Sequence, residues 1–163
     1  MNDVAICPGS FDPVTLGHLD IIERTAATFT RTVVAVLENP VKAPLFSTAE
    51  RCELLRQATG HLSGVEVKHF RGLLVEFARA EGARVIIRGL RALSDFEAEF
   101  QMALTNKHLA PEIETMFMVT RPEFSFLSSS MVKELIRFGG SVTGFVTPAV
   151  EKALLAKRSL LQR

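Results

Sequence analysis

The chain has 163 residues, which suits a single domain over 1–163 with a sizeable core. Its 47% hydrophobic content and positive mean hydropathy exclude a disordered protein, and its net charge of +1 gives no overall attraction to nucleic acid. The apolar runs are too short for a membrane span and no secretory signal is visible, so we expect a cytoplasmic protein without nucleic-acid or membrane partners.

Apolar and β-branched runs alternate with helical patterns from one end of the chain to the other. Strands are predicted at 4–7, 32–37, 65–69, 84–87 and 115–119. Helices are predicted near 17–28, 48–58, 73–81, 94–109, 129–138 and 148–157. This alternation favours an α/β protein whose parallel sheet is covered by helices on both faces.

Several residues mark the predicted helix boundaries. Ser47 and Ser94 each have a glutamate three residues later, which is the capping-box pattern of a helix start. Pro148 suits the first turn of a helix, and C-cap glycines are expected at 82, 139 and 140. The tail at 157–163 is basic and polar, and it is expected to fray.

The order of the elements also predicts a topology. Right-handed crossovers would wind the first three strands in one direction, and the chain could then return to place the fourth strand beside the first. The result is a Rossmann-like, doubly wound, five-stranded sheet of order 3-2-1-4-5. Its switch point, where such sheets bind ligands, lies between strands one and four. The loops at 8–18 and 88–91 follow these strands and should meet at one crevice.

The segment 8–18 joins the first strand to a helix through a glycine-bearing turn, which is where α/β proteins hold phosphate. Thr15 is the expected N-cap and places His18 in the first turn, where the helix dipole should lower its pKa and favour neutral imidazole. Gly9 and Gly17 would permit close approach of the backbone to a ligand. The alternative is a capped helix with an ordinary histidine.

Basic residues follow two of the strands. Arg88 and Arg91 bracket a glycine after the fourth strand, and guanidinium groups bind phosphates through paired hydrogen bonds. The alternative is a solvated basic turn, which the position at the switch point disfavours. Lys42 lies in a loop stiffened by two prolines after the second strand, but a lone loop lysine is usually solvated.

The segment 124–130 contains two phenylalanines and ends in three serines at a helix start. Capping explains one serine, and anion binding would explain the others. The phenylalanines could stack on a base, although packing is the commoner fate of such residues. Glu97 and Glu99 belong to a helix face that is expected to be solvated.

Other common forms of catalytic site find little support in the sequence. Cys7 and Cys52 have no metal-ligand or redox spacing and suit buried positions in a reducing compartment. No histidine cluster has metal-ligand spacing, and no Ser/His/Asp or Cys/His nucleophile arrangement is evident. Phosphate-binding groups without a nucleophile indicate phosphoryl or nucleotidyl transfer by positioning and charge stabilisation.

Four motifs together resemble those of bacterial phosphopantetheine adenylyltransferases, which are nucleotidyltransferases with a T/HxGH motif. They are PGSFDPVTLGH at 8–18, the Lys42 loop, IIRGLRALSDFEAEFQMA at 86–103 and EFSFLSSSMVKEL at 123–135. The resemblance implies transfer of the adenylyl group of ATP to 4′-phosphopantetheine, giving dephospho-coenzyme A and pyrophosphate by direct in-line attack. It also implies Mg²⁺ held mainly through substrate phosphates, a homohexamer, and coenzyme A as a candidate feedback ligand.

The same resemblance assigns roles to individual residues. Catalytic roles would fall to His18, Lys42 and Arg91. Phosphopantetheine would be held by Ser10, Lys42, Leu74 and Arg88. ATP would be held by Ser10, Phe11, His18, Gly89, Leu90, Arg91, Glu99, Phe124, Ser125, Phe126, Leu127, Ser128, Ser129 and Ser130. Phe124 stands where relatives often have tryptophan or tyrosine. Lys133 stands where broader relatives often have arginine, which leaves its role at a phosphate open.

Two alternatives remain open at this point. Nicotinate mononucleotide adenylyltransferases and glycerol phosphate cytidylyltransferases usually carry HxGH, whereas Thr15 is the first motif residue here. The cytidylyltransferases also use an RTxGISTT-like segment, which this chain lacks. A nucleotide-sensing module would bind ATP without turnover, but the joint presence of His18, Lys42, Arg88 and Arg91 argues against it.

Overall fold

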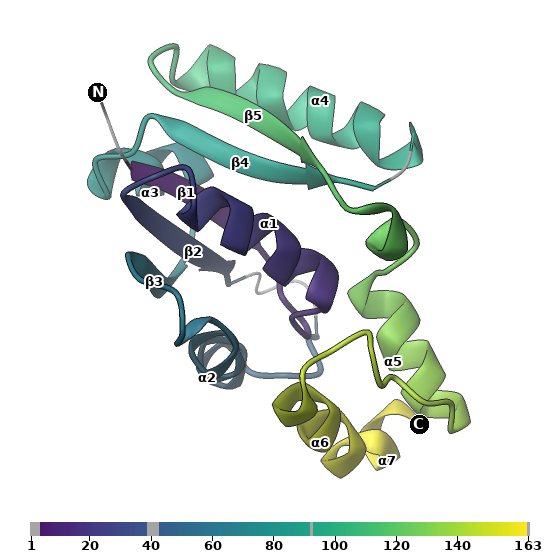
Figure 1. Ribbon diagram of the computed structural model, residues 1–163. Helices are drawn as coiled ribbons and strands as arrows, with labels where there is room; N and C mark the ends of the chain where they lie inside the picture. Colours follow the sequence, from purple (N-terminus) through teal and green to yellow (C-terminus); the bar gives the residue numbers. More distant parts are fainter. Residues whose placement is uncertain (1–3, 39–42, 92, 163) are drawn as a thin grey trace.

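A computed structural model describes residues 4–38, 43–91 and 93–162 (Figure 1). Its five strands form one parallel sheet of order β3-β2-β1-β4-β5, which confirms the predicted topology. The strands are β1 (Val4–Gly9), β2 (Arg31–Leu37), β3 (Val65–Phe70), β4 (Val85–Leu90) and β5 (Glu114–Val119).

Two strands continue two or three residues further than the sequence predicts. β1 includes Pro8 and Gly9, which pair with Ala35 and Val36 of β2. β4 includes residues 88–90, which pair with β5, so the predicted loop at 88–91 is wrong for its first three residues. A parallel neighbour supplies hydrogen-bond partners to residues of low strand propensity, and this tertiary effect overrides the local sequence signal.

The helices lie close to their predicted positions. They are α1 (Leu16–Ala26), α2 (Thr48–Thr59), α3 (Leu74–Ala80), α4 (Leu93–Leu109), α5 (Ser129–Phe138) and α6 (Pro148–Ala156). A 3₁₀ turn, η1 (Pro122–Phe124), and a short helix, α7 (Arg158–Leu161), are additional to the prediction. The Lys157 ammonium binds the Glu50 carboxylate at 2.7 Å and the Leu45 carbonyl at 3.1 Å, so the start of the tail predicted to fray is attached to the body.

The predicted helix caps are mostly confirmed. Ser47 Oγ accepts from the N–H of Glu50, and the Glu50 carboxylate accepts from the N–H of Ser47. Pro148 is the first residue of α6, and Gly139 ends α5 with a left-handed φ of 83°. The predicted cap at Ser94 is wrong, because α4 begins at Leu93 and Ser94 therefore lies inside the helix. A capping-box pattern marks a helix start only to within a residue or two.

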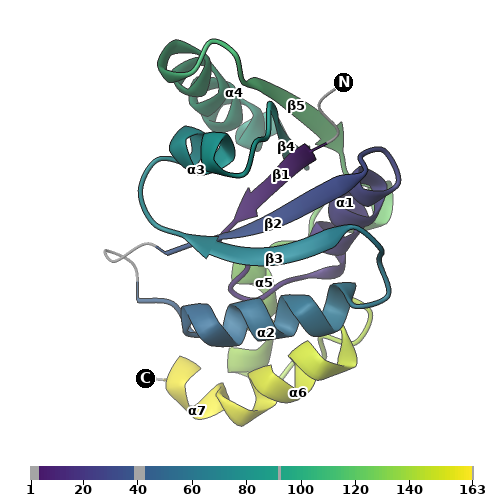
Figure 2. The ribbon, with the colours of Figure 1, turned by 90° about the vertical axis from the view of Figure 1, so that its left-hand side faces the viewer.

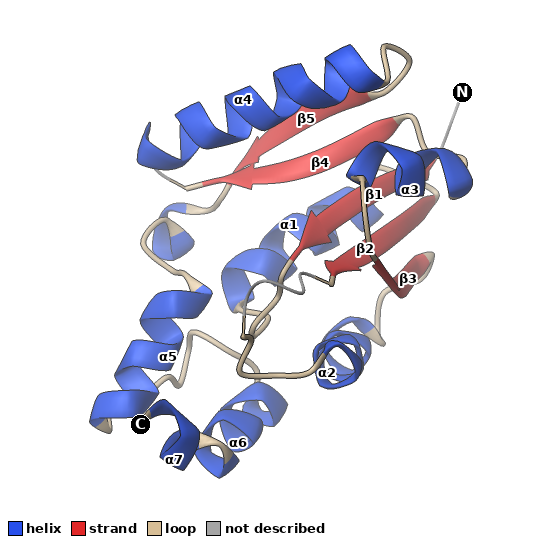
Figure 3. Ribbon diagram, turned by 180° about the vertical axis from the view of Figure 1, so that it is seen from behind, coloured by secondary structure: helices blue, strands red, loops and turns tan. Residues whose placement is uncertain are grey.

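The sheet separates two apolar layers, as predicted for strands buried on both faces. Alternate residues of β1 and β2 point to opposite faces: Cys7 and Val34 pack with α1 and α2, whereas Ile6 and Val33 pack with α3. Figure 1 shows α1 in front of the sheet, and Figure 3 shows α3 on the opposite face. Right-handed crossovers produce this arrangement, because the chain winds in opposite directions on the two sides of β1.

The C-terminal helices extend the layer that contains α1 and α2. Figure 2 shows α6 and α7 on the far side of α2 from β3. Val132, Ile136, Val150 and Leu154 join α5 and α6 to the core beneath α1 and α2. This packing fixes the N-terminus of α5 near the carboxyl end of the sheet.

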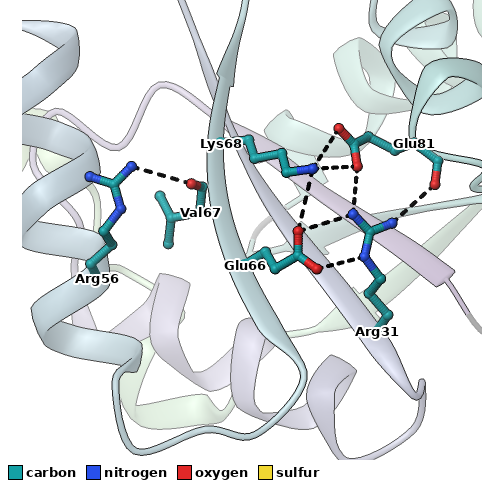
Figure 4. Close-up of polar contacts among 6 residues, drawn as sticks. All are labelled: Arg31, Arg56, Glu66, Val67, Lys68 and Glu81. Atoms are coloured by element: carbon teal, nitrogen blue, oxygen red, sulfur yellow. Dashed lines mark hydrogen bonds and ion pairs between the residues drawn. The ribbon is translucent and has the colours of Figure 1, made fainter.

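A network of charges attaches the end of α3 to the sheet (Figure 4). The Glu81 carboxylate accepts from the Arg31 guanidinium of β2 at 2.6 Å and from the Lys68 ammonium of β3 at 2.8 Å. Arg31 also binds the Glu66 carboxylate, and its hydrogen bonds lower the pKa of Glu66 to about 2. These groups are partly exposed, so each pair stabilises the fold only modestly. On the other side of β3, Arg56 reaches the Val67 carbonyl (Figure 4).

Within the described parts of the chain, none of the helices combines the length and the apolar character that crossing a bilayer requires.

Candidate active site

A cleft of about 380 Å³ opens where β1 and β4 end, at the predicted switch point. Its walls come from the turn after β1, the first turn of α1, the end of β4, one face of α4 and the start of α5. The two predicted loops meet here, because Arg88 Nη1 donates to the Pro8 carbonyl at 2.7 Å. Predicted site residues that line the cleft are Ser10, Phe11, His18, Arg88, Gly89, Arg91, Glu99, Leu127, Ser128, Ser129 and Ser130.

His18 is held by the N-cap of its own helix. Thr15 Oγ1 accepts from the His18 N–H, and the Thr15 N–H donates to His18 Nδ1 at 3.0 Å. A backbone N–H can only donate, so Nδ1 must present its lone pair. The neutral ring therefore carries its hydrogen on Nε2 and has one donor left for a ligand.

The surroundings of His18 keep the imidazole neutral. Burial, together with the positive charges of Arg91 and Arg88, lowers the pKa of His18 to about 4, and burial contributes most. The pKa of His18 is lowered, as predicted, but the main cause is burial of the ring and not the helix dipole. The Phe11 ring packs edge-on against the imidazole with ring centroids 5.1 Å apart, which also restricts the ring's orientation.

Arg88 is oriented by an acidic partner. Its guanidinium binds the Glu99 carboxylate through two nitrogens, with Nε 2.6 Å from Oε2. The Glu99 side chain is only 15% exposed, so the predicted solvated face is wrong for Glu99, whereas Glu97 is exposed. The sequence pattern misses this because α4 packs along β4 and turns Glu99 toward the cleft.

Arg91 links the end of β4 to the start of α5. Its Nη1 donates to the Leu127 carbonyl at 2.8 Å. Ser128 caps α5 by accepting from the Met131 N–H, and Ser129 Oγ donates to the Pro13 carbonyl at 2.7 Å. Capping thus accounts for one serine, as predicted, and all three serines line the cleft beside the N-terminus of α5.

The remaining predicted residues lie outside the cleft lining. Leu90 is in β4 and accepts from Thr120, Leu74 begins α3 beside the opposite core, and Ser125 follows η1. The Phe124 Cβ lies 3.4 Å from the position that a Cβ at Gly17 would take, so Phe124 packs closely over this glycine. The exposed Phe126 ring packs edge-on against Phe145. Lys42 is outside the described residues. Phe124 and Phe126 therefore have packing partners in the protein.

Two glycines at the cleft are required by close approaches. A Cβ at Gly9 would lie 2.9 Å from the Phe11 ring, which must stay in place to contact His18. A Cβ at Gly89 would lie 3.0 Å from Ile21 Cγ1, where β4 passes α1. Larger residues would force these elements apart.

The sequence reasoning missed a buried hub at Asp12. The Asp12 carboxylate accepts from the N–H groups of Leu45 and Phe46 at 3.0 and 2.9 Å, and from the Lys133 ammonium at 3.0 Å. The hub joins the first loop to the chain after Lys42 and to α5. Lys133 therefore binds a carboxylate of the protein, and a single sequence contains no signal that would pair these distant residues.

The described part of the cleft has the chemistry of a polyphosphate site. It combines a neutral imidazole donor, the guanidinium groups of Arg88 and Arg91, and the N-termini of α1 and α5. Among the described side chains, those of residues 4–38, 43–91 and 96–162, no group of three or more His, Cys, Asp or Glu could hold a metal ion.

Comparison with known proteins identifies the family. The cytidylyltransferase-like family matches residues 6–135. The phosphopantetheine adenylyltransferase of Heliobacterium modesticaldum is 59% identical over 147 residues, or 90% of this chain and 88% of the relative. The chain belongs to the phosphopantetheine adenylyltransferase family. The Caldanaerobacter subterraneus member is 56% identical over 94% of this chain and 96% of its own length.

Two solved structures share the fold of this phosphopantetheine adenylyltransferase family member. A Vibrio parahaemolyticus chain described as a nicotinate-nucleotide adenylyltransferase superposes with a TM-score of 0.75 at 19% identity, covering 99% of this chain and 98% of its own. Plasmodium falciparum nicotinic acid mononucleotide adenylyltransferase gives 0.69 at 13% identity, covering 98% and 97%. At these identities the likeness concerns architecture alone.

Proposed function

We propose that this protein transfers the adenylyl group of ATP to 4′-phosphopantetheine and releases dephospho-coenzyme A and pyrophosphate. The observation that carries the proposal is the Thr15–His18 contact, which leaves a neutral Nε2–H donor in a cleft with two arginines. The names of relatives that are 53–59% identical select this reaction among nucleotidyl transfers.

The proposed chemistry needs no protein nucleophile. A phosphate oxygen of phosphopantetheine attacks the α-phosphorus of ATP, and the bond from that phosphorus to the departing pyrophosphate oxygen breaks. His18 Nε2–H donates to a phosphate oxygen as charge develops, and Lys42 and Arg91 stabilise the same charge. Ser10, Lys42, Leu74 and Arg88 would bind the acceptor. ATP would lie along Gly89–Arg91 and 124–130.

We expect Mg²⁺ to enter as part of the substrate, MgATP. Magnesium keeps several waters and often binds through substrate phosphates with one or two carboxylates, and it would bridge the phosphates and offset their charge. Among the described residues that line the cleft, Glu99 supplies the carboxylate, and the Arg88 guanidinium already binds it. The donor set therefore suits a metal carried by phosphates.

Pyrophosphate release tests the proposal directly. The purified protein should release pyrophosphate from ATP only when phosphopantetheine is present. Nicotinate mononucleotide with ATP, and glycerol phosphate with CTP, should give background rates. Turnover with either of these pairs would indicate a sister enzyme. ATP binding without pyrophosphate release from any pair would indicate a nucleotide-sensing module.

We also propose a homohexamer. Supporting it, α4 and the edge strand β5 expose large apolar side chains, including Phe100, Leu104, Met116 and Val119. Large apolar side chains exposed on neighbouring elements are typical of interfaces. Light scattering at micromolar concentration should give about six times the chain mass of 18.0 kDa. A stable monomer would contradict the proposal.

Two finer expectations belong to the same proposal. Coenzyme A contains the product's skeleton, so it should compete in the pyrophosphate assay if it is a feedback ligand. Unchanged rates with added coenzyme A would reject that role.

We expect the reaction in the cytoplasm, which suits the free, buried thiols of Cys7 and Cys52.

A further inference from the structure

Helix α1 contains a second functional candidate, two residues after His18. The Asp20 side chain is only 1% exposed, and its carboxylate is bound by a segment about one hundred residues further along the chain. Oδ2 accepts from the Arg121 backbone N–H at 3.2 Å, and Oδ1 lies 2.9 Å from Arg121 Nε. Burial of a carboxylate is costly unless it is compensated in this way.

Arg24 reinforces the connection one turn later on α1. Its Nη1 lies 3.3 Å from Asp20 Oδ2 and donates to the Val119 carbonyl at 2.8 Å. Val119 ends β5, so both ends of the tripeptide 119–121 are attached to α1. Thr120, between them, lines the cleft, and its N–H and Oγ1 both donate to the Leu90 carbonyl.

The attached segment leads directly into one wall of the cleft. Figure 1 shows the chain running from β5 past α1 to α5. After Arg121 it forms η1, where Phe124 packs over Gly17 on α1, and it continues to Leu127, whose carbonyl binds Arg91. Asp20 thus fixes the start of a segment whose other contacts reach Gly17 and Arg91.

An ordinary surface ion pair would not have these properties. The guanidinium groups of Arg24 and Arg121 are partly exposed, but the carboxylate that they share is buried and also accepts a backbone hydrogen bond. A buried carboxylate that accepts a backbone and a guanidinium hydrogen bond on Oδ2, and forms an ion pair through Oδ1, fixes geometry more firmly than exposed pairs do. The contact therefore sets the distance between the helix that carries His18 and the 120–130 segment.

We propose that Asp20 is a positioning residue for the nucleotide, which it serves by holding residues 119–121, and hence the wall at 124–130, against α1. The inference rests on the proposed function for the assignment of that wall to ATP. Phosphopantetheine should be nearly insensitive to Asp20, because its expected contacts at Ser10, Leu74 and Arg88 lie outside the attached segment.

The test compares the binding of two ligands. Calorimetric titration of Asp20→Asn with the non-hydrolysable analogue α,β-methylene-ATP should show a Kd raised about tenfold or more, since a charged hydrogen-bond acceptor is lost. The Kd for phosphopantetheine should change less than about twofold. Glu23→Gln is the matched control, because it also replaces a carboxylate by an amide, at a partly exposed position of α1, and should leave both constants unchanged.

A second variant covers the case in which Asp20→Asn does not fold. Arg121→Gln removes an exposed side chain and keeps the backbone N–H, so it should fold and raise the Kd for the analogue alone by a smaller factor. Equal losses for both ligands, or no change in either, would overturn the inference. Failure of the proposed function would look different: the wild-type protein would bind the analogue but release no pyrophosphate.

Discussion

The backbone N–H of Thr15 donates a hydrogen bond to Nδ1 of His18 across 3.0 Å, while Thr15 Oγ1 accepts from the His18 N–H. The two residues thus cap each other as the N-cap and the third residue of α1. The same exchange that starts the helix also selects the tautomer of the histidine. A structural cap and a catalytic donor therefore share one motif.

Removal of the imidazole should cost turnover more than binding. We predict that His18→Ala lowers kcat by about 10²-fold or more, the scale for loss of a preorganised donor to a developing charge. The Kd for an ATP analogue should change much less, because the arginines and the helix N-termini remain. Steady-state kinetics with calorimetry would check both values. Near wild-type kcat would exclude a role in the transition state.

Thr15 should matter mainly for stability. Thr15→Ala removes the hydroxyl cap, which costs about 1 kcal/mol of unfolding free energy, but it keeps the backbone N–H that binds His18 Nδ1. Urea unfolding should detect this loss, and Thr15→Ser should restore most of it. The kcat of Thr15→Ala should stay well above that of His18→Ala. Equal inactivation would mean that the hydroxyl itself acts on the substrate.

The neutral state of His18 predicts the pH dependence. The folded pKa of about 4 lies below the ordinary value of 6.5, so kcat/KM should show no loss near pH 6.5 from this group. Between pH 6.5 and about 4, His18 is protonated in the unfolded chain but stays neutral in the folded protein. The contribution of His18 to stability is therefore complete above pH 6.5 and is lost as pH falls toward 4.

Unfolding midpoints measured from pH 7.5 to 4.5 would test that dependence. The fall in stability should be shallower for His18→Asn, which does not titrate, than for the wild-type protein. Identical pH slopes for the two proteins would mean that His18 is not held neutral by the fold.

The fold was open to prediction because its determinants are local and repeated. Buried apolar runs such as 33–36 identify strands, and each connection has a fixed handedness that orders them. The ends of β1 and β4 were not predictable, because partner strands extend them through Gly9 and Gly89.

The site was predictable only where the motif itself carries the chemistry. His18 and Arg91 follow directly from their places after β1 and β4. The Arg88–Glu99 pair and the Asp12 hub depend on how α4 and α5 pack, which no local pattern encodes. Glu99 shows the consequence, because on its helix alone it resembles a solvated acid.

Arg88 should affect the acceptor more than the nucleotide. Arg88→Ala should raise the KM for phosphopantetheine about tenfold or more, the scale for loss of a charged hydrogen bond, with a smaller rise for ATP. The Arg88→Ala variant also leaves the buried Glu99 carboxylate unpaired. The double variant Arg88→Ala/Glu99→Gln removes that unpaired charge and is therefore the necessary control. Lys42→Ala should show the same selectivity. Equal losses for both substrates would refute these assignments.

The last prediction joins the metal to the mechanism. The reaction brings a phosphomonoester dianion to a triphosphate, and the cationic side chains of Lys42, Arg88 and Arg91 cannot offset all of that charge. Chelation of Mg²⁺ should therefore abolish pyrophosphate release while the circular dichroism spectrum and unfolding midpoint stay unchanged, because the metal enters with ATP. Tight Mg²⁺ binding to the ligand-free protein would contradict this. With chirally labelled ATP, a single in-line displacement should invert the α-phosphorus, whereas retention or a trapped adenylyl-protein would require a nucleophile in the cleft.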